Sequence, residues 1–448
     1  MLKSKYVFFV TSILWVMLVS CTSQVTPIIE ISSKESMFDE PISIRILNCP
    51  ENEPIKLRAT VFDDDSVEWT SVNTYLPNND VVDLALISPI SGSYDSIDEM
   101  GFIWSMKPNN IEKPVLFSSR KLSPLNIQIE VHINDSLVAS SHLSRLRIRP
   151  DVVRIKVREE GLVGTLFIPK SADNIPGIID LTGSGGDLSE TRAALLASHG
   201  YITFALAYFG IESLPKTLDN IPLEYFEKAI HYLQRQEEVD PNRIGIIGGS
   251  RGGELSLLVA STYSKITCVI GYVPSGFINP GSTGGAAWTL NGKSLPFISQ
   301  EPDMQVIAEI QKNIAEGKAV SFKPMFNSII KNRNALGDTE IPIEKINGPV
   351  LLISGQDDQI WPSAQLSEFA VQRLNAKNFT HQIIHLTYPN AGHSIGPPYR
   401  PTSINEAVHP VSSILMKLGG TAAGNAHACM DSWQQMLLFL KESFDIGG

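Results

Sequence analysis

The chain has 448 residues, and 36 Lys and Arg against 47 Asp and Glu give it a formal net charge of −11. At about 100 to 200 residues per domain, this length suits two or three domains. Hydrophobic residues make up 43% and charged residues 19%, which excludes a disordered, collagen-like or polytopic membrane protein. The acidic balance, without any basic run, argues against a nucleic-acid partner, because phosphate contacts need clustered Lys and Arg.

The four cysteines are Cys21, Cys49, Cys268 and Cys429. They are widely scattered and form neither a CxxC pair nor a disulfide framework. The sequence therefore predicts no structural metal site, and nothing in it indicates a cofactor.

Residues 1–20 have the layout of a secretory signal. Lys3 and Lys5 precede an apolar run, Tyr6 to Val19, which is too short to span about 30 Å of hydrocarbon comfortably. A plain cleaved signal peptide and a single anchor helix are the alternatives.

The sequence Leu18-Val19-Ser20-Cys21 resembles the bacterial lipobox, in which the cysteine becomes lipidated and N-terminal after cleavage. On this interpretation Cys21 is a lipid attachment site, and residues 21–30 are a tether. It predicts a lipid-anchored protein of the bacterial cell envelope, at the outer membrane or cell surface rather than in the cytoplasm.

Residues 31–150 contain short alternating runs such as Ile55 to Phe62 and Ile127 to Ile133, separated by turn clusters such as Pro77 to Asp80. Period-two alternation with turns at this spacing predicts an antiparallel β-sandwich. We find no catalytic constellation in it, so it is expected to pack against the following domain.

Residues 155–448 have a different pattern and predict an α/β-hydrolase domain. Leu223, Phe226, Ile230 and Leu233 mark one face of a helix. Strands without alternation are typical of a mostly parallel sheet covered by helices on both faces. A long segment at about 276–344 predicts a cap over the site. The continuous apolar runs expected to form strands are Gly177 to Leu181, Tyr201 to Leu206, Ile244 to Ile247, Ile266 to Tyr272, Val350 to Ser354 and His381 to Leu386.

Ser250 is the candidate nucleophile. It lies in Gly248-Gly249-Ser250-Arg251-Gly252, a G-x-S-x-G motif between the apolar strand at 244–247 and an apolar helix. A serine between a strand and a helix in this way is exposed at a sharp elbow. The motif is weakly specific by itself, and this context makes it more specific. The alternative, a phosphate-binding turn, lacks the GxGxxG or GK[ST] pattern.

A serine nucleophile needs a base and an orienting carboxylate. Asp358 follows the strand that ends at Ser354, and His393 follows the next strand along the chain. The neighbouring Asp357 competes for the acid role, but Asp358 is the preferred candidate and Asp357 is expected to be structural. The order Ser, Asp, His is that of the fold. The remaining histidines are expected to be solvated or satisfied: His132, His142, His199, His231, His381, His385, His409 and His427.

The oxyanion hole is expected to use the backbone N–H of Arg251 and donors from the loop Thr182 to Asp187. Gly183 and Ser184 are the candidate donors in that loop. A flexible turn without a catalytic role is the alternative.

Several long motifs, in the right order, resemble the acyl-CoA thioesterase and bile acid-CoA:amino acid N-acyltransferase family. The likeness covers nearly the whole chain after the signal, including the expected β-sandwich. The motifs that carry it include Phe38-Asp39-Glu40-Pro41, Met100-Gly101-Phe102-Ile103-Trp104, Pro176-Gly177-Ile178-Ile179-Asp180, Gly249-Ser250-Arg251-Gly252-Gly253-Glu254-Leu255, Gly355-Gln356-Asp357-Asp358 and Tyr388-Pro389-Asn390-Ala391-Gly392-His393.

The resemblance implies a triad of Ser250, Asp358 and His393 that hydrolyses an acyl-CoA to fatty acid and CoA through an acyl-serine, without metal or cofactor. The family's amino acid transferase branch uses cysteine as nucleophile, so serine favours hydrolysis. The expected partners are an acyl-CoA or other acyl ester as substrate and a membrane through Cys21. Export from the cytoplasm would separate the chain from CoA. The alternatives are therefore an extracytoplasmic acyltransferase or carboxylesterase acting on another ester or amide, or an inactive surface-anchored binding lipoprotein.

Overall fold

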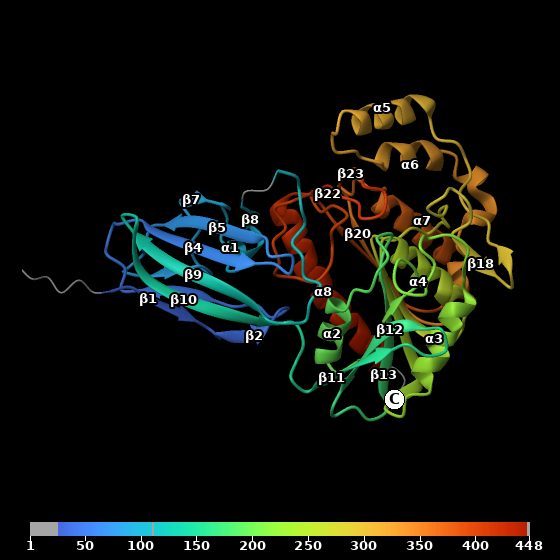
Figure 1. Ribbon diagram of the computed structural model, residues 1–448, viewed down its shortest axis with the longest axis horizontal. Coiled ribbons are helices and arrows are strands. Elements are labelled where there is room, and N and C mark those ends of the chain that lie inside the picture. Colours follow the sequence, from blue (N-terminus) through green and yellow to red (C-terminus); the bar gives the residue numbers. More distant parts are fainter. Residues whose placement is uncertain (1–25, 110–111, 446–448) are drawn as a thin grey trace, which may run out of the picture.

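The computed structural model describes residues 26–109 and 112–445. A β-rich N-terminal part and a larger α/β part lie side by side (Figure 1). The predicted signal peptide and Cys21 lie outside the described residues. Within residues 26–109 and 112–445, no helix has both the length and the apolar character needed to cross a bilayer.

Two sheets form the N-terminal part. Their inward side chains share one core, to which β4 contributes the alternate residues Ile55, Leu57, Ala59 and Val61. One sheet has the order β1-β3-β6, and the other has the order β2-β10-β9-β4-β5-β7, with β8 paired to β5. Their strands, with the short helix α1 (Gly101–Trp104), are β1 (Ile28–Ile31), β2 (Glu35–Met37), β3 (Ile44–Leu47), β4 (Ile55–Phe62), β5 (Glu68–Tyr75), β6 (Val82–Asp83), β7 (Ser91–Gly92), β8 (Lys107–Pro108), β9 (Leu125–Ile133) and β10 (Ser136–Leu146).

Two features of this part differ from the sequence prediction. The predicted tether, residues 21–30, extends too far, because Ile28–Ile31 is strand β1 and pairs antiparallel with β3. Only four residues long, this strand gave too little alternation to be recognised. In addition, the three-residue strand β2 pairs in parallel with β10, so the sandwich is not wholly antiparallel.

Eight of the strands between Val152 and Tyr388 form one sheet, in the order β11-β12-β14-β13-β16-β17-β20-β21. β12 is antiparallel to both its neighbours, whereas β14, β13, β16, β17, β20 and β21 are mutually parallel. This arrangement confirms the predicted α/β-hydrolase sheet. Its strands are β11 (Val152–Val157), β12 (Val163–Pro169), β13 (Ile175–Leu181), β14 (Ile202–Ala207), β16 (Val239–Gly249), β17 (Ile266–Tyr272), β20 (Val350–Gly355) and β21 (Ile383–Tyr388).

Helices cover both faces of this sheet. α2 (Thr191–Ser198) and α8 (Ala422–Asp445) share a core with Ile178 and Ile247, whereas α3 (Glu224–Gln234), α4 (Arg251–Thr262) and α7 (Ser363–Ala376) share one with Ile179 and Ile246. Neighbouring residues of each strand therefore point into different cores, which is why these strands are continuously apolar.

The segment between β17 and β20 corresponds to the predicted cap. It contains β18 (Trp288–Leu290), β19 (Lys293–Ser294), the helices α5 (Met304–Ala315) and α6 (Lys323–Ile330), and the 3-10 helices η1 (Arg333–Thr339) and η2 (Ile343–Lys345). β18 and β19 form a small sheet with β15 (Ile221–Pro222). Near the C-terminus, β22 (Glu406–Val408) and β23 (Leu415–Lys417) form a hairpin. Apart from the tether, the division of the chain into domains at the stated boundaries stays a prediction.

The N-terminal part packs on α8 of the hydrolase part (Figure 1). Asp39 accepts hydrogen bonds from the indole of Trp433 at 2.9 Å and also contacts His199. Asp98 pairs with His427 across the same interface at 3.0 Å. Buried side chains of both parts belong to one continuous core, so the sandwich is fixed against the catalytic part rather than tethered to it.

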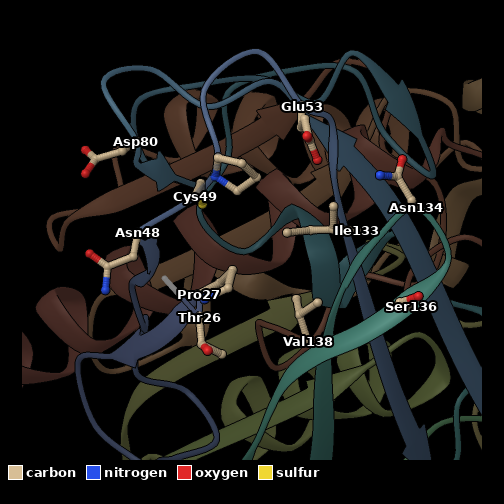
Figure 2. Close-up of a pocket in the computed structure, with 11 residues that line it drawn as sticks. Thr26, Pro27, Asn48, Cys49, Glu53, Asp80, Ile133, Asn134, Ser136 and Val138 are labelled. Atoms are coloured by element: carbon tan, nitrogen blue, oxygen red, sulfur yellow. The ribbon is translucent and has the colours of Figure 1, made fainter. Parts of the chain in front are cut away.

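At the end of the sandwich near Thr26 lies a cavity of about 910 Å³. Figure 2 shows its lining by the chain before β1, the β3–β4 connection and the β9–β10 turn. Burial raises the pKa of its Cys49 thiol to about 11, so this cysteine is not an activated nucleophile. The cavity shares no lining residue with the hydrolase sheet.

Candidate active site

Ser250 lies at a sharp elbow between β16 and α4. Its backbone has φ of 57° and ψ of −121°, a conformation that costs energy in a non-glycine residue. The neighbouring glycines are required by close backbone contacts: a Cβ at Gly248 would lie 2.1 Å from the carbonyl oxygen of Gly252, and one at Gly252 would lie 2.2 Å from that of Thr182. The motif thus places the serine at the carboxyl edge of the sheet.

His393 lies on the loop after β21, and its Nε2 is 2.8 Å from the Oγ of Ser250. The backbone N–H of His393 donates to the carbonyl of Leu418 at 2.8 Å, which fixes the loop that carries the ring. A histidine at this distance can accept the proton of the serine hydroxyl.

Asp358 follows β20 and is fully buried. Its Oδ2 is 2.8 Å from Nδ1 of His393, while its Oδ1 accepts the backbone N–H groups of Ile360 at 2.9 Å and Trp361 at 3.3 Å. The carboxylate is therefore fixed at both oxygens. Asp357 is exposed and accepts the backbone N–H of Gly420 at 2.8 Å instead. The structure brings Asp358, and not Asp357, to the histidine.

The loop after β13 lies directly beside the serine. A Cβ built on Gly183 would be 3.3 Å from the Cβ of Ser250 and 3.9 Å from its Oγ. On the other side, Arg251 is the first residue of α4, where helix N–H groups have no partner within the helix. Gly183 and Arg251 therefore both adjoin the nucleophile, and Ser184 follows Gly183 in the same turn.

A buried polar network below the elbow was not predicted. The Arg251 guanidinium pairs with the fully buried Glu254 at 2.9 Å, and Trp288 and Asn279 of the cap segment donate to the same carboxylate at 3.1 Å and 2.8 Å. Burial raises the pKa of Glu254, although the charge of Arg251 and these hydrogen bonds act in the opposite direction. The network connects Arg251, the residue after the nucleophile, to the cap. The one sign of it in the sequence is Glu254, a carboxylate in a helix that is otherwise mostly apolar.

Trp361 is a second residue that sequence reasoning missed. It packs against His393, and its Nε1–H donates to the carbonyl of Val273 at 3.0 Å. Val273 has a φ of 41°, which is rare for a β-branched residue. Phe326 on α6 packs against the same indole, so the cap contacts the histidine through one aromatic side chain.

Within the described residues, no group of three or more His, Cys, Asp or Glu side chains could hold a metal ion.

The serine lies at an elbow of a mostly parallel sheet, and it is hydrogen-bonded to a histidine that is hydrogen-bonded in turn to a buried carboxylate. This arrangement is typical of the α/β-hydrolase class. The comparisons then show its family. The family model described as BAAT / Acyl-CoA thioester hydrolase C terminal matches residues 221–445, and the one described as Acyl-CoA thioester hydrolase/BAAT N-terminal region matches residues 39–159. The chain belongs to this family, which confirms the resemblance found in the sequence.

The curated relatives are thioesterases. Mouse peroxisomal succinyl-coenzyme A thioesterase is 32% identical over 417 residues, covering 90% of this chain and 93% of that protein. Rat acyl-coenzyme A thioesterase 1 is 32% identical over 421 residues, covering 92% and 95%. Human mitochondrial acyl-coenzyme A thioesterase 2 is 31% identical over 412 residues, covering 90% and 81%. These relatives confirm the predicted class, a thioester-cleaving hydrolase.

Among solved structures, an esterase of Pyrobaculum calidifontis is 13% identical with a TM-score of 0.39, covering 65% of this chain and 85% of that one. A puromycin-hydrolyzing peptidase of Mycobacterium tuberculosis is 13% identical with a TM-score of 0.41, covering 94% and 68%.

The predicted localisation in the bacterial cell envelope is wrong by the same comparison. The relatives whose names give a compartment are peroxisomal or mitochondrial eukaryotic thioesterases, and nothing in the comparison supports a lipid anchor. The prediction depended on the lysines, the apolar run and Cys21 within the first 21 residues alone.

Proposed function

We propose that the chain hydrolyses acyl-CoA thioesters through an acyl-Ser250 intermediate, with His393 as general base and acid and Asp358 as the orienting carboxylate. The observation that carries this proposal is the continuous relay of two 2.8 Å hydrogen bonds from Ser250 Oγ through the His393 ring to Asp358 Oδ2. The thioesterase relatives supply the substrate class.

The first half-reaction forms the acyl-enzyme. Ser250 Oγ attacks the thioester carbonyl while His393 Nε2 takes its proton, and the carbonyl oxygen becomes an oxyanion. The backbone N–H of Arg251 and the donors of Gly183 and Ser184 stabilise that charge, each worth on the order of 100- to 1,000-fold in kcat. Collapse breaks the C–S bond, and His393 returns the proton to the CoA thiolate.

The second half-reaction uses water. His393 accepts a proton from water, whose oxygen attacks the acyl-serine carbonyl, and the proton then passes to Ser250 Oγ as the carboxylic acid leaves. The buried Asp358 stabilises the imidazolium in both steps and fixes the ring with Nε2 toward the serine. A serine nucleophile supports hydrolysis over transfer, because the transferase branch that the chain resembles uses cysteine.

The test is thiol release from a series of acyl-CoAs by the full-length chain. Wild type should release CoA and free acid in equal amounts, Ser250→Ala should release none above background, and Ser264→Ala, an exposed serine after α4, should match wild type. The melting temperature of each variant shows whether it is folded.

Three outcomes would count against this proposal. If glycine or taurine supplied with the acyl-CoA yields conjugate in place of free acid, the chain is an acyltransferase. If oxygen esters are cleaved and thioesters are not, it is a carboxylesterase. Binding of acyl-CoA without any turnover would indicate a binding protein.

A further inference from the structure

The β22–β23 hairpin contacts three of the four loops of the proposed site, those that carry His393, Asp358 and Ser184. At its base, the carbonyl of Leu418 accepts the backbone N–H of His393 at 2.8 Å and that of Gln359, next to Asp358, at 3.3 Å. At its tip, His409 Nε2 is 3.0 Å from the Oγ of Ser184 on the oxyanion loop. The last contact joins residues 225 positions apart and belongs to none of the mechanistic steps above.

The hairpin tip determines which nitrogen of His409 carries the hydrogen. His409 Nδ1 accepts the backbone N–H groups of Val411 at 3.3 Å and Ser412 at 3.1 Å. A nitrogen that accepts hydrogen bonds cannot carry a hydrogen, so in the neutral ring the hydrogen is on Nε2. His409 therefore donates to Ser184 Oγ. Burial lowers the pKa of His409, which favours the neutral form.

The other partner is a glycine-rich turn. The N–H of Gly186 donates to the carbonyl of Gly183 at 3.3 Å, and Ser184 lies between them. A Cβ on Gly185 would lie 3.2 Å from the Cγ of Pro410, so the hairpin tip also packs directly on the turn. Glycines give such a turn conformational freedom, which an external contact must restrict if its N–H groups are to keep one direction.

We propose that His409 is a positioning residue for the reaction: its Nε2–H holds the Ser184 hydroxyl and thereby fixes the Gly183–Ser184 main-chain donors beside Ser250. This inference rests on the proposed function, since it assigns a purpose to the oxyanion loop. Misplacement of an oriented group by about 1 Å can cost about 100-fold in rate. His409 acts on the oxyanion only through Ser184.

Substitutions can separate the two nitrogens of the ring. His409→Asn keeps an acceptor near the Nδ1 position for the hairpin tip and removes the donor to Ser184, whereas His409→Gln carries an N–H that can reach Ser184. Ser184→Ala removes the accepting hydroxyl, and Ser184→Thr keeps it. His231→Asn, at an exposed position on α3, is the matched control.

We expect His409→Asn and Ser184→Ala each to lower kcat by about 10- to 100-fold and to leave KM within about twofold of wild type. Affinity for an acyl trifluoromethyl ketone, which forms an oxyanion on the serine, should fall by the same factor as kcat, and the melting temperature should not move. The double variant should be no slower than Ser184→Ala. His409→Gln and Ser184→Thr should recover much of each loss, and His231→Asn should match wild type.

Additive losses in the double variant would overturn the inference, as would losses confined to KM or to the melting temperature. If His409→Asn is destabilised, His409→Gln and Ser184→Thr decide the question instead. Each of these two variants keeps a hydrogen bond between positions 409 and 184. Recovery of kcat in both supports the inference, and recovery in neither overturns it. If wild type hydrolyses the substrate and His409→Asn has an unchanged kcat, the positioning role is rejected and the proposed function is not. Equal thiol release by wild type and Ser250→Ala rejects the proposed function and this inference with it.

Discussion

The indole of Trp361 packs edge-on against the imidazole of His393, with ring centroids 5.8 Å apart and planes inclined by 75°. Phe326 of α6 packs in turn on Trp361, with centroids 5.8 Å apart. The proposed base therefore has the Asp358 carboxylate at its Nδ1 and an aromatic contact from Trp361, which the cap contacts in turn. Trp361 shares its backbone segment with Asp358, so one loop orients the imidazole in two ways.

Trp361→Phe should keep the aromatic contact and lose the hydrogen bond to the carbonyl of Val273. An unsatisfied buried carbonyl costs about 1–3 kcal/mol, so we expect a loss of that size in the free energy of unfolding, measured by urea denaturation. Trp361→Ala should lose about 3–5 kcal/mol because it also leaves a cavity. A Trp361→Phe protein as stable as wild type would show that the bond to Val273 contributes nothing.

Asp358→Asn should lower kcat by about 10,000-fold, because an amide no longer selects the imidazole tautomer that accepts the proton of Ser250. Steady-state thiol release measures the loss. Asp357→Asn is the matched control: its exposed side chain keeps an oxygen to accept the N–H of Gly420, and kcat should stay close to wild type. If Asp357→Asn is the more damaging change, Asp357 and not Asp358 is the catalytic carboxylate.

Glu254→Gln should destabilise the protein by about 3–5 kcal/mol, because it leaves the buried Arg251 charge without its partner. Glu30→Gln tests the opposite case. Glu30 pairs with Arg45, but the two side chains are 50% and 48% exposed, so the loss should stay below about 1 kcal/mol. Chemical denaturation of both variants gives the two values. Equal losses would mean that the Arg251–Glu254 pair is solvated in the folded protein.

The His427–Asp98 contact should make the interface between the two parts depend on pH. The hydrogen bond that His427 donates to Asp98 raises the pKa of His427 above 6.5. Burial alone would raise the pKa of Asp98, but its hydrogen bonds from His427, Trp104 and Met100 outweigh burial and lower it below 3.8. The pair therefore stabilises the fold fully between about pH 4 and 6.5 and loses this contribution as pH rises through the raised pKa of His427.

Melting temperatures of wild type and His427→Gln test this window. The two proteins should differ more at about pH 5.5 than at about pH 9. The effect should be small, below about 1 kcal/mol, because the His427 side chain is 56% exposed. His231→Gln, on the exposed face of α3, should show no such pH dependence. If the two melting temperatures differ by the same amount at both pH values, the charge of His427 does not stabilise the interface.

Residues whose positions follow from the fold could be predicted from the sequence. Ser250, Asp358 and His393 each follow a strand of a parallel sheet, and the carboxyl ends of such strands lie at one edge. β17 was predicted at Ile266–Tyr272 with its observed limits. β21, by contrast, begins at Ile383, two residues later than predicted, because the pairing with β20 begins only at that residue.

Contacts between distant segments could not be predicted. His409 was expected to face solvent or to have ordinary hydrogen-bond partners, and no local pattern relates it to Ser184. Asn279 and Trp288 lie in the cap, and only the folded chain brings them to Glu254. His427 meets Asp98 across the two parts of the molecule for the same reason. Tertiary packing, and not propensity or spacing, determines these partners.

Labelling of the full-length chain by a fluorophosphonate, followed by peptide mapping, tests the central claim most directly. An activated serine should take up one phosphonyl group, located on Ser250, and Ser250→Ala should take up none while keeping the wild-type melting temperature. His393→Ala should be labelled far more slowly, because the serine then lacks its base. Labelling of Ser250→Ala at the wild-type rate, or no labelling of wild type, would contradict the assignment of Ser250 as the nucleophile.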